Sequence, residues 1–192
     1  MGWANGAGDR FGDQLMALTI DQLQEVMPQL GTPFARIYLG PLNEAMHEAD
    51  ISTSALRTAA FLAQIAHESH ELQWWHELAS GAEYEGRKDL GNTEPGDGVR
   101  YKGRGPIQLT GRANYRAAGK ALGVDLEAHP EAAQLPSVGF RTAAWFWTTH
   151  GLNALADAGN FRAITQRING GLNGEAEREA YYAKAKQMLG IA

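Results

Sequence analysis

The pattern of apolar and polar positions predicts a mainly helical chain. In several windows, apolar residues recur every three or four positions, which is the spacing of one face of an α-helix. Alanine occurs 31 times and valine four times, a balance that favours helices because β-branched residues pack best on pleated sheets. We therefore expect a mostly α protein.

The N-terminal part of the chain predicts two successive helices. Thr19 is a good N-cap for a short amphipathic helix over residues 20–27. Pro33 fits the first turn of a second helix, where a missing amide donor does no harm. Gly40-Pro41 should end this second helix, because an internal proline removes a backbone hydrogen bond.

Residues 52–70, STSALRTAAFLAQIAHESH, give the clearest helical pattern. Serine and threonine at 52–54 supply N-caps, and Glu68 lies at the C-terminal end of the pattern. The spacing predicts one buried stripe, made of Leu56, Ala59, Ala60, Ala63 and His67.

The second half of the chain begins with a glycine-rich segment over residues 80–105 that shows little apolar periodicity, and we expect a long functional loop there. Helices should follow near 111–122, 137–150, 161–168 and 175–189, several of them closed by Gly123, Gly151 and Gly190. Two helical lobes joined by the glycine-rich segment would leave a cleft between them.

Composition narrows the possible classes of protein. The 192 residues are 44% hydrophobic and 20% charged, with a mean hydropathy of -0.36, as in soluble globular proteins. A net charge of -5 argues against nucleic acid as a partner. The chain has no cysteine, which excludes disulfides, thiolate nucleophiles and thiolate metal sites.

The N-terminus shows neither the basic start nor the apolar stretch of a signal peptide, and no window is apolar enough to span a membrane. We expect one domain over residues 1–192, with residues 1–16 loosely ordered and no second, separate module. The chain should be a monomer without stable membrane association. Any action outside the cytoplasm would then need another agent to release the protein.

Two carboxylates suggest acid–base chemistry. Glu68 follows a largely apolar helix, and a dry surrounding would favour the protonated form that a general acid needs. Glu77 lies nine residues further on, beyond the helix end, and could face Glu68 across a gap. Glycoside hydrolysis requires two carboxyl groups in unlike environments. Both residues could equally lie on a solvated face, as most acidic residues do.

Aromatic residues near these carboxylates are candidates for stacking on sugar rings. They are Trp74, Trp75, Tyr84 and Tyr101, although core packing is their alternative role. Trp145, Phe146 and Trp147 lie on a strongly apolar helix and are expected in the core.

Histidines 67, 70 and 76 raise the alternative of a metal site. In His67-Glu68-Ser69-His70 the second histidine stands at i+3, whereas a zinc-protease helix places it at i+4. With no evident third ligand, we expect no metal and interpret His67 as a packed, hydrogen-bonded residue.

A basic cluster lies between Val99 and Val124, where no acidic residue occurs. It could contact an anionic polymer or form internal ion pairs; an anionic polymer is the interpretation that agrees with the carboxylate pair. The cluster consists of Arg100, Lys102, Arg104, Arg112, Arg116 and Lys120.

Three motifs together resemble the glycoside hydrolase family 19 pattern of chitinases and, more closely, that of the compact phage and prophage endolysins of the family. They are AHES at 66–69, YKGRGPIQLTGRANY at 101–115 and INGG at 168–171, in the order that the family has them. The resemblance spans roughly residues 55–190 and implies a lysozyme-like fold, mainly α, with a substrate cleft between two lobes.

The resemblance also implies roles for individual residues. Glu68 would be the general acid, Glu77 the base, with Glu83 and Glu85 as alternative bases, and Thr110 would help to hold the attacking water. No cofactor is implied. The substrate-binding positions would be Tyr101, Gln108, Asn114, Asn169 and Arg178, with Tyr101 lining the cleft.

The implied activity is an inverting cleavage of a β-1,4 glycan. The chain lacks the cysteines of plant chitinases and has Ala113 where many of those enzymes carry tyrosine, so we expect the glycan strands of peptidoglycan as substrate. The protein would then be an endolysin that stays in the host cytoplasm until a holin admits it to the periplasm and wall. Three alternatives remain: a chitinase, a metal-dependent wall peptidase and a non-catalytic glycan-binding module.

Overall fold

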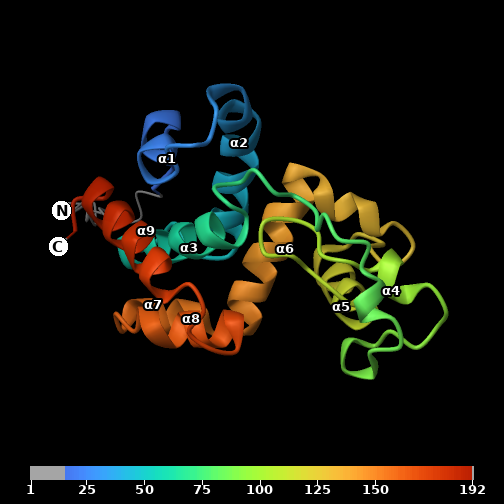
Figure 1. Cartoon of the computed structure of the whole chain (residues 1–192). Helices are drawn as coiled ribbons and strands as arrows, with labels where there is room; N and C mark the ends of the chain where they lie inside the picture. The colour runs from blue at the N-terminus through green and yellow to red at the C-terminus, as the bar shows by residue number, and fades with distance from the viewer. Residues whose placement is uncertain (1–15, 192) are drawn as a thin grey trace, which may run out of the picture.

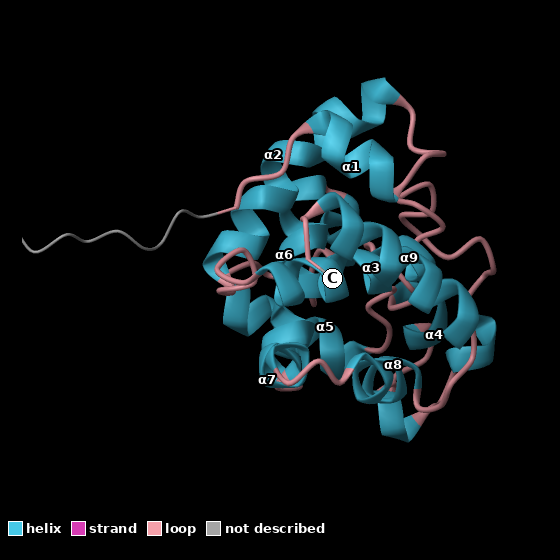
Figure 2. Cartoon of the chain, turned by 90° about the vertical axis from the view of Figure 1, so that its left-hand side faces the viewer, coloured by secondary structure: helices cyan, strands magenta, loops and turns pink. Residues whose placement is uncertain are grey.

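The computed structural model describes residues 16–191, so the expectation of a loosely ordered start falls on residues outside the described range, apart from residue 16. The described chain is built from helices and loops, with two isolated β-bridges and no named strand (Figure 2). Within it, nine α-helices follow one another: α1 (Ile20–Val26), α2 (Thr32–Glu48), α3 (Ala55–Glu68), α4 (Asp97–Arg100), α5 (Arg112–Leu122), α6 (Pro136–Thr149), α7 (Leu152–Asp157), α8 (Phe161–Asn169) and α9 (Glu175–Met188).

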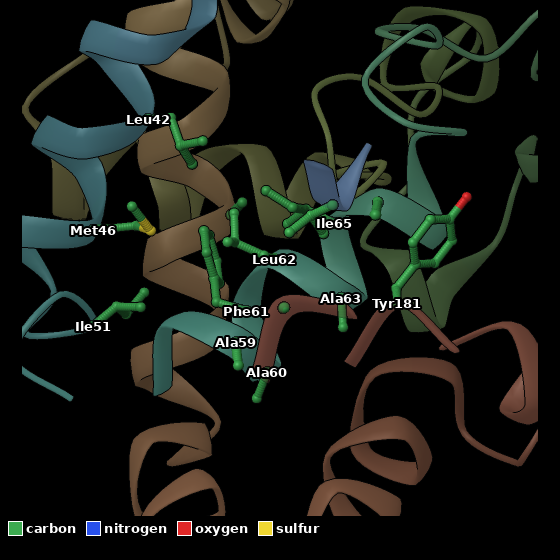
Figure 3. Close-up of a cluster of buried hydrophobic side chains, with 14 of the residues drawn as sticks. Leu42, Met46, Ile51, Ala59, Ala60, Phe61, Leu62, Ala63, Ile65 and Tyr181 are labelled. Carbon is green, nitrogen blue, oxygen red and sulfur yellow. The ribbon is translucent and has the colours of Figure 1, made fainter. Parts of the chain in front are cut away.

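A large lobe surrounds α3, the most buried helix. Every residue from Thr58 to Ala66 is buried, and α1, α7 and α9 pack against this helix. Its alanines let α9 approach closely, while the side chains of Phe61 and Leu62 lie toward Leu42 and Met46 of α2 (Figure 3). A helix that is apolar on all sides is expected in a core, so the prediction of a single buried stripe was too narrow.

A small lobe contains a second, separate core. Its buried residues are Tyr101, Leu109, Tyr115, Ala118, Leu126 and Ala133. Helix α6 lies between the two lobes and serves both, since Trp147 belongs to the large core and Trp145 packs against the small one (Figure 1). The expectation of two helical lobes is confirmed.

Most predicted helices are confirmed, including the caps. Thr19 forms a capping box with Gln22, and Ser54 accepts a hydrogen bond from the Arg57 amide. Helices α5, α6, α8 and α9 match the predicted ranges. The predicted terminal glycines Gly123, Gly151 and Gly190 all have positive φ.

Two predictions about helices need correction. Helix α2 continues through Pro41 to Glu48 instead of ending at Gly40-Pro41. Proline removes the bond to the carbonyl of Ile37, which lies on an exposed stretch of the helix where water can replace it. Helix α7 was not predicted, because its six residues are too few for a periodic pattern.

The glycine-rich segment 80–105 is mostly loop, as predicted. It also contains two short 3₁₀ turns, Ala82–Tyr84 and Lys88–Leu90, and the single turn of α4. Backbone bridges link His76 to Arg104 and Arg104 to Leu109, so the segment returns beside the chain that leaves α3. This return brings the two halves of the candidate site into one region of the fold.

Candidate active site

Glu68 ends α3 and is held by a buried arginine. Arg178, on α9, is 2% exposed and donates from Nη2 to Glu68 Oε1 at 2.5 Å. The Glu68 side chain is 22% exposed, so it remains accessible from solvent. No hydrogen bond within residues 16–191 occupies Oε2 of Glu68. One carboxylate oxygen is therefore fixed and the other is free to act.

A buried polar chain supports Arg178 in turn. Its Nη1 donates to Gln64 Oε1, and Gln64 Nε2 donates to Thr165 Oγ1 at 2.9 Å on α8. Arg178 Nε donates to the carbonyl of Asn173 at 3.2 Å. With every nitrogen engaged, the guanidinium has one orientation, and Glu68 is held by α3, α8 and α9 together.

This arrangement differs from the dry pocket expected around Glu68. The side chains of Phe61 and Ile65 are buried in the core, and the carboxylate faces a guanidinium instead of an apolar wall. The acid role expected for Glu68 would therefore use the oxygen that Arg178 leaves free.

His67 is half-buried beside Glu68, as expected for a packed residue. Its Nδ1 lies 2.8 Å from Glu177 Oε2 on α9. Gly174 lies directly against the imidazole ring, where any Cβ would collide with it. His70 does not share a helix face with His67, because α3 ends at Glu68; His70 stacks on Trp74 at 4.7 Å.

Glu77 lies on the segment that returns to the small lobe. Its amide donates to the carbonyl of Gly103 at 2.9 Å, and its Oε2 accepts the Gly103 amide at 3.0 Å. Its Oε1 accepts the Tyr84 hydroxyl at 2.9 Å. Burial and the bond to Glu77 raise the pKa of Tyr84 to about 12, which keeps the hydroxyl a donor.

Because Gly103 has no side chain, two other side chains can approach its Cα closely. A Cβ at this position would lie 2.6 Å from Gln108 Oε1 and 3.3 Å from Glu77 Oε2. The amide of Gln108 therefore lies next to the carboxylate of Glu77. Gln108 has a φ of 54°, and its Nε2 donates to the carbonyl of Gly105 at 3.0 Å, so a strained turn fixes its direction.

The remaining predicted residues divide between the two carboxylates. Thr110 donates to the carbonyl of Gln108 at 2.8 Å, and Asn114 donates to the carbonyl of Thr110 at 2.8 Å, so both are tied to the Gln108 turn. Asn169 donates to the carbonyl of Asn173 at 3.3 Å, the acceptor that Arg178 also uses. Asn169 therefore belongs to the part of the candidate site that contains Glu68.

Two residues assigned to substrate binding are almost fully buried. Tyr101 is 1% exposed and packs on Tyr115 in the small core, where it also borders an open hollow of the small lobe. Arg178 is also buried, and its nitrogens are engaged by the protein, so it positions Glu68 and cannot contact a glycan directly.

The basic cluster forms internal contacts, which was the alternative to contact with an anionic polymer. Arg112 pairs with Asp97 at 2.5 Å, and Arg116 pairs with Glu127 at 2.6 Å. Arg100 and Arg104 donate to backbone carbonyls of the same lobe. A hollow of about 850 Å³ borders this network, lined in part by Asp97, Arg112 and Glu127.

Glu85 and Glu83 differ from Glu77 in their surroundings. Glu85 accepts the amides of Gly96 and Gly98 at 2.7 and 2.9 Å and so closes the loop structurally. Glu83 is exposed in the 3₁₀ turn Ala82–Tyr84. Of the three candidates for the base, Glu77 alone joins the Gln108 turn.

The candidate aromatics also separate by burial. Trp75 is 9% exposed and packs on Tyr38 and Phe140, whereas Trp74 is 51% exposed. Trp147 is buried in the core as predicted, whereas Trp145 and Phe146 are only partly buried. Within residues 16–191, no three His, Asp or Glu side chains are arranged to hold a metal ion, and no helix is long and apolar enough to cross a membrane.

Several residues of the site were missed by sequence reasoning. Gln64 interrupts an alanine- and leucine-rich run four positions before Glu68, and a lone amide in such a run is a signal of a buried polar contact. Gly103 lies inside the motif at 101–115, but its contact with Glu77 depends on the return of a distant loop.

Comparisons with known proteins find several similar chains. The family model described as "Chitinase class I" matches residues 44–155. A glycosyl hydrolase family 19 domain-containing protein of Haemophilus influenzae is 42% identical over 106 residues, which are 55% of this chain and 51% of that protein. An endochitinase of Arabidopsis thaliana is 41% identical over 140 residues, 69% of this chain and 48% of that protein. The chain thus spans about half the length of these relatives.

Solved structures extend the likeness to nearly the whole chain. Chitinase C from Streptomyces griseus superposes with a TM-score of 0.75 at 25% identity, covering 92% of this chain and 78% of that one. A bacterial family 19 chitinase gives a TM-score of 0.76 at 26% identity, covering 92% and 97%.

Proposed function

Because the chain belongs to glycoside hydrolase family 19, we propose that it cleaves a β-1,4-linked glycan of N-acetylated amino sugars and that its natural substrate is bacterial peptidoglycan. The observation that carries the proposal is the pair Glu68 and Glu77. The two carboxylates lie nine positions apart in the sequence and are held by different partners, a guanidinium in one case and a hydroxyl and an amide in the other.

The roles follow from these partners. Glu68 protonates the leaving oxygen through its free Oε2, while Arg178 keeps the carboxyl group in place. Glu77, which accepts two hydrogen bonds, acts as the base that activates water held with Thr110. Inversion of the anomeric carbon needs room for that water, with the carboxyl groups roughly 6.5–9.5 Å apart. Gln108, Asn114 and Asn169 offer side-chain amides to the N-acetyl and hydroxyl groups of the sugars.

The catalytic base is tested by three variants. Glu77→Gln should lower the turnover of glycan about 10²-fold or more, because an amide cannot accept the proton of the water. Glu83→Gln is the matched control on the exposed turn and should keep full activity. An active Glu77→Gln together with an inactive Glu83→Gln or Glu85→Gln would move the base to the later loop.

Chitin is the second candidate substrate, because the relatives and solved structures are described as chitinases. Mass spectrometry of fragments from purified peptidoglycan and from chitin oligomers, assayed side by side, separates the two. Muropeptides with a new reducing sugar support the wall substrate and identify the bond that is cut. Turnover of chitin oligomers alone contradicts it, and no turnover of either leaves the non-catalytic binding module.

A metal-dependent wall peptidase predicts a different response to chelation. We expect EDTA to leave the activity on purified peptidoglycan unchanged, since proton transfer to and from carboxylates needs no Lewis acid. Inhibition that added zinc reverses would favour the peptidase.

The endolysin role concerns where the enzyme acts. We propose a monomer that lyses a cell from the periplasmic side after release by a holin. Expression in a bacterium should be tolerated until a holin is co-expressed or the chain is fused to a secretion signal. Lysis by the unfused chain alone would contradict dependence on a holin, and the elution volume of the purified protein tests the monomer.

A further inference from the structure

The backbone that follows Glu68 is strained over three consecutive residues. His70, Glu71 and Leu72 have φ values of 51°, 56° and 61°, in the left-handed region that side chains with a Cβ rarely adopt. The backbone amides of the turn are nonetheless hydrogen-bonded. The Glu71 amide donates to the carbonyl of Ala66, and the Leu72 amide donates to Ser69 Oγ. Such a run persists only where the surrounding structure holds it.

The side chain of Glu71 helps to hold this strained turn in place. It is 3% exposed, and its Oε1 accepts the hydroxyl of Tyr181 at 2.8 Å. Its Oε2 accepts the backbone amide of Gln29 at 2.5 Å. A buried carboxylate that joins α9 to the connection between α1 and α2 fixes the position of the turn from two sides.

The contact that holds Glu71 resembles the contact that holds Glu68. Arg178 and Tyr181 are three residues apart on α9, and they hold Glu68 and Glu71, which are three residues apart on the other chain segment. One face of α9 therefore fixes both the carboxylate proposed as acid and the turn after it. That turn leads through Trp75, whose carbonyl accepts the Gly105 amide, to Glu77.

We propose that Glu71 is a positioning residue for this acid–base pair: its contact with Tyr181 sets where Glu68 and Glu77 stand relative to one another. The inference rests on the proposed function, since it concerns the reaction of that pair. Glu71 itself is buried and does not touch the substrate. Removing its anchor should therefore change the geometry of catalysis more than the binding of glycan.

The decisive variant is Tyr181→Phe, which deletes one hydroxyl and keeps the ring. We expect kcat on a soluble glycan to fall about ten- to hundredfold, because a small misplacement of the reacting groups is costly. KM should stay within about twofold, since contacts with substrate are unchanged. Tyr182→Phe is the matched control: its ring stacks on Phe161, and its hydroxyl makes no hydrogen bond within residues 16–191.

Glu71→Gly tests the same contact by removing the carboxylate instead of the hydroxyl. Glycine accepts a positive φ, so this variant relieves the backbone strain while it loses the hydrogen bond to Tyr181. Its kcat should fall as in Tyr181→Phe, and the double variant should be no slower than the slower single one, as for two residues acting through one contact. A merely structural role would instead lower the melting temperature and leave kcat per folded molecule intact.

Two outcomes would overturn the proposal. If Tyr181→Phe keeps its kcat within twofold of wild type while Glu68→Gln is inactive, Glu71 does not position the pair, and this result holds even when Glu71→Gly fails to fold. If wild-type protein turns over neither peptidoglycan nor chitin oligomers, the proposed function fails and the positioning role fails with it.

Discussion

The two lobes are stabilised by different kinds of contact. The large lobe is held by apolar packing around α3, where nine successive residues are buried. The small lobe has only six buried apolar residues in its core, and it is held by ion pairs and hydrogen bonds around Tyr101 and Tyr115. The large lobe gains stability from area removed from water, and the small lobe from a network of ion pairs and hydrogen bonds.

The candidate site draws on both kinds of contact. Glu68 extends from the central helix of the large lobe and is fixed by a buried arginine. Glu77 is fixed by the loop of the small lobe, through Gly103 and Tyr84. An active site of this design combines a rigid acid with a base whose position depends on a loop, and the following predictions test that difference.

The largest effect is expected from Glu68→Gln. Without a proton to donate, turnover should fall about 10²–10⁴-fold. The amide oxygen can still accept from Arg178, so the protein should fold, and the assay is kcat of the folded fraction on purified peptidoglycan. Glu48→Gln, on an exposed surface pair with Arg141, is the control and should remain active. A folded Glu68→Gln with wild-type turnover would refute the assignment of the acid.

Apolar packing in the large lobe is tested by Phe61→Ala. Phe61 is fully buried, with its ring 5.3 Å from that of Trp147 in an edge-to-face arrangement. We expect the free energy of unfolding to fall by about 3–5 kcal/mol, from lost burial and the cavity left behind. Phe34→Ala, at a side chain 56% exposed, should change it by less than about 0.5 kcal/mol. Chemical denaturation measures both, and equal losses would mean that packing around α3 is not what holds this lobe.

The polar network of the small lobe is tested by Tyr115→Phe, which keeps the ring and removes one hydroxyl. That hydroxyl donates to the carbonyl of Lys102 at 2.7 Å and accepts from Arg104 Nη1 at 2.9 Å. Losing these two hydrogen bonds should cost about 1–3 kcal/mol. The loss should appear as faster amide exchange in residues 97–128 with little change in α3. Uniform acceleration across both lobes would show that the network does not act locally.

The same difference explains how much could be predicted from the sequence. Helix α3 and its cap could be predicted, because apolar periodicity and Ser54 are local signals. Glu68 and Glu77 were proposed as acid and base through the resemblance of their motifs to a known family, and this assignment stays a prediction. The small lobe could not be predicted in this way, since Arg112 pairs with Asp97 fifteen residues away and pairings at that separation leave no periodic pattern.

The differences between these expectations and the structure have a related cause. Tyr101 was expected in the cleft because an aromatic residue near a catalytic motif can stack on sugar, and composition cannot distinguish that ring from one in a core. The arginines were expected to face an anionic polymer because their partners, such as Glu127, lie outside the basic stretch of sequence. In both cases the tertiary structure decides which surface a side chain meets.

The smallest expected effect is a loss of the small lobe's protection in acid. Burial raises the pKa of Asp97, but hydrogen bonds from Arg112 and from backbone amides outweigh it and lower the pKa below the ordinary value of 3.8. A lowered folded pKa means that Asp97 contributes stability above the unfolded value and that this contribution is lost as the pH falls through the folded value. The Arg116 contact likewise lowers the pKa of Glu127. In the large lobe, Asp157 also has a lowered pKa through Arg57, but that pair is solvent-exposed and should contribute little.

Amide exchange followed from pH 5 down to about 3, corrected for intrinsic rates, should therefore show residues 97–128 losing protection before residues 58–66. Asp97→Asn should remove much of this pH dependence, and Asp157→Asn should leave it in place. Loss of protection at the same pH in both lobes would mean that the two lobes unfold as one unit and that their different contacts do not give them separate stabilities.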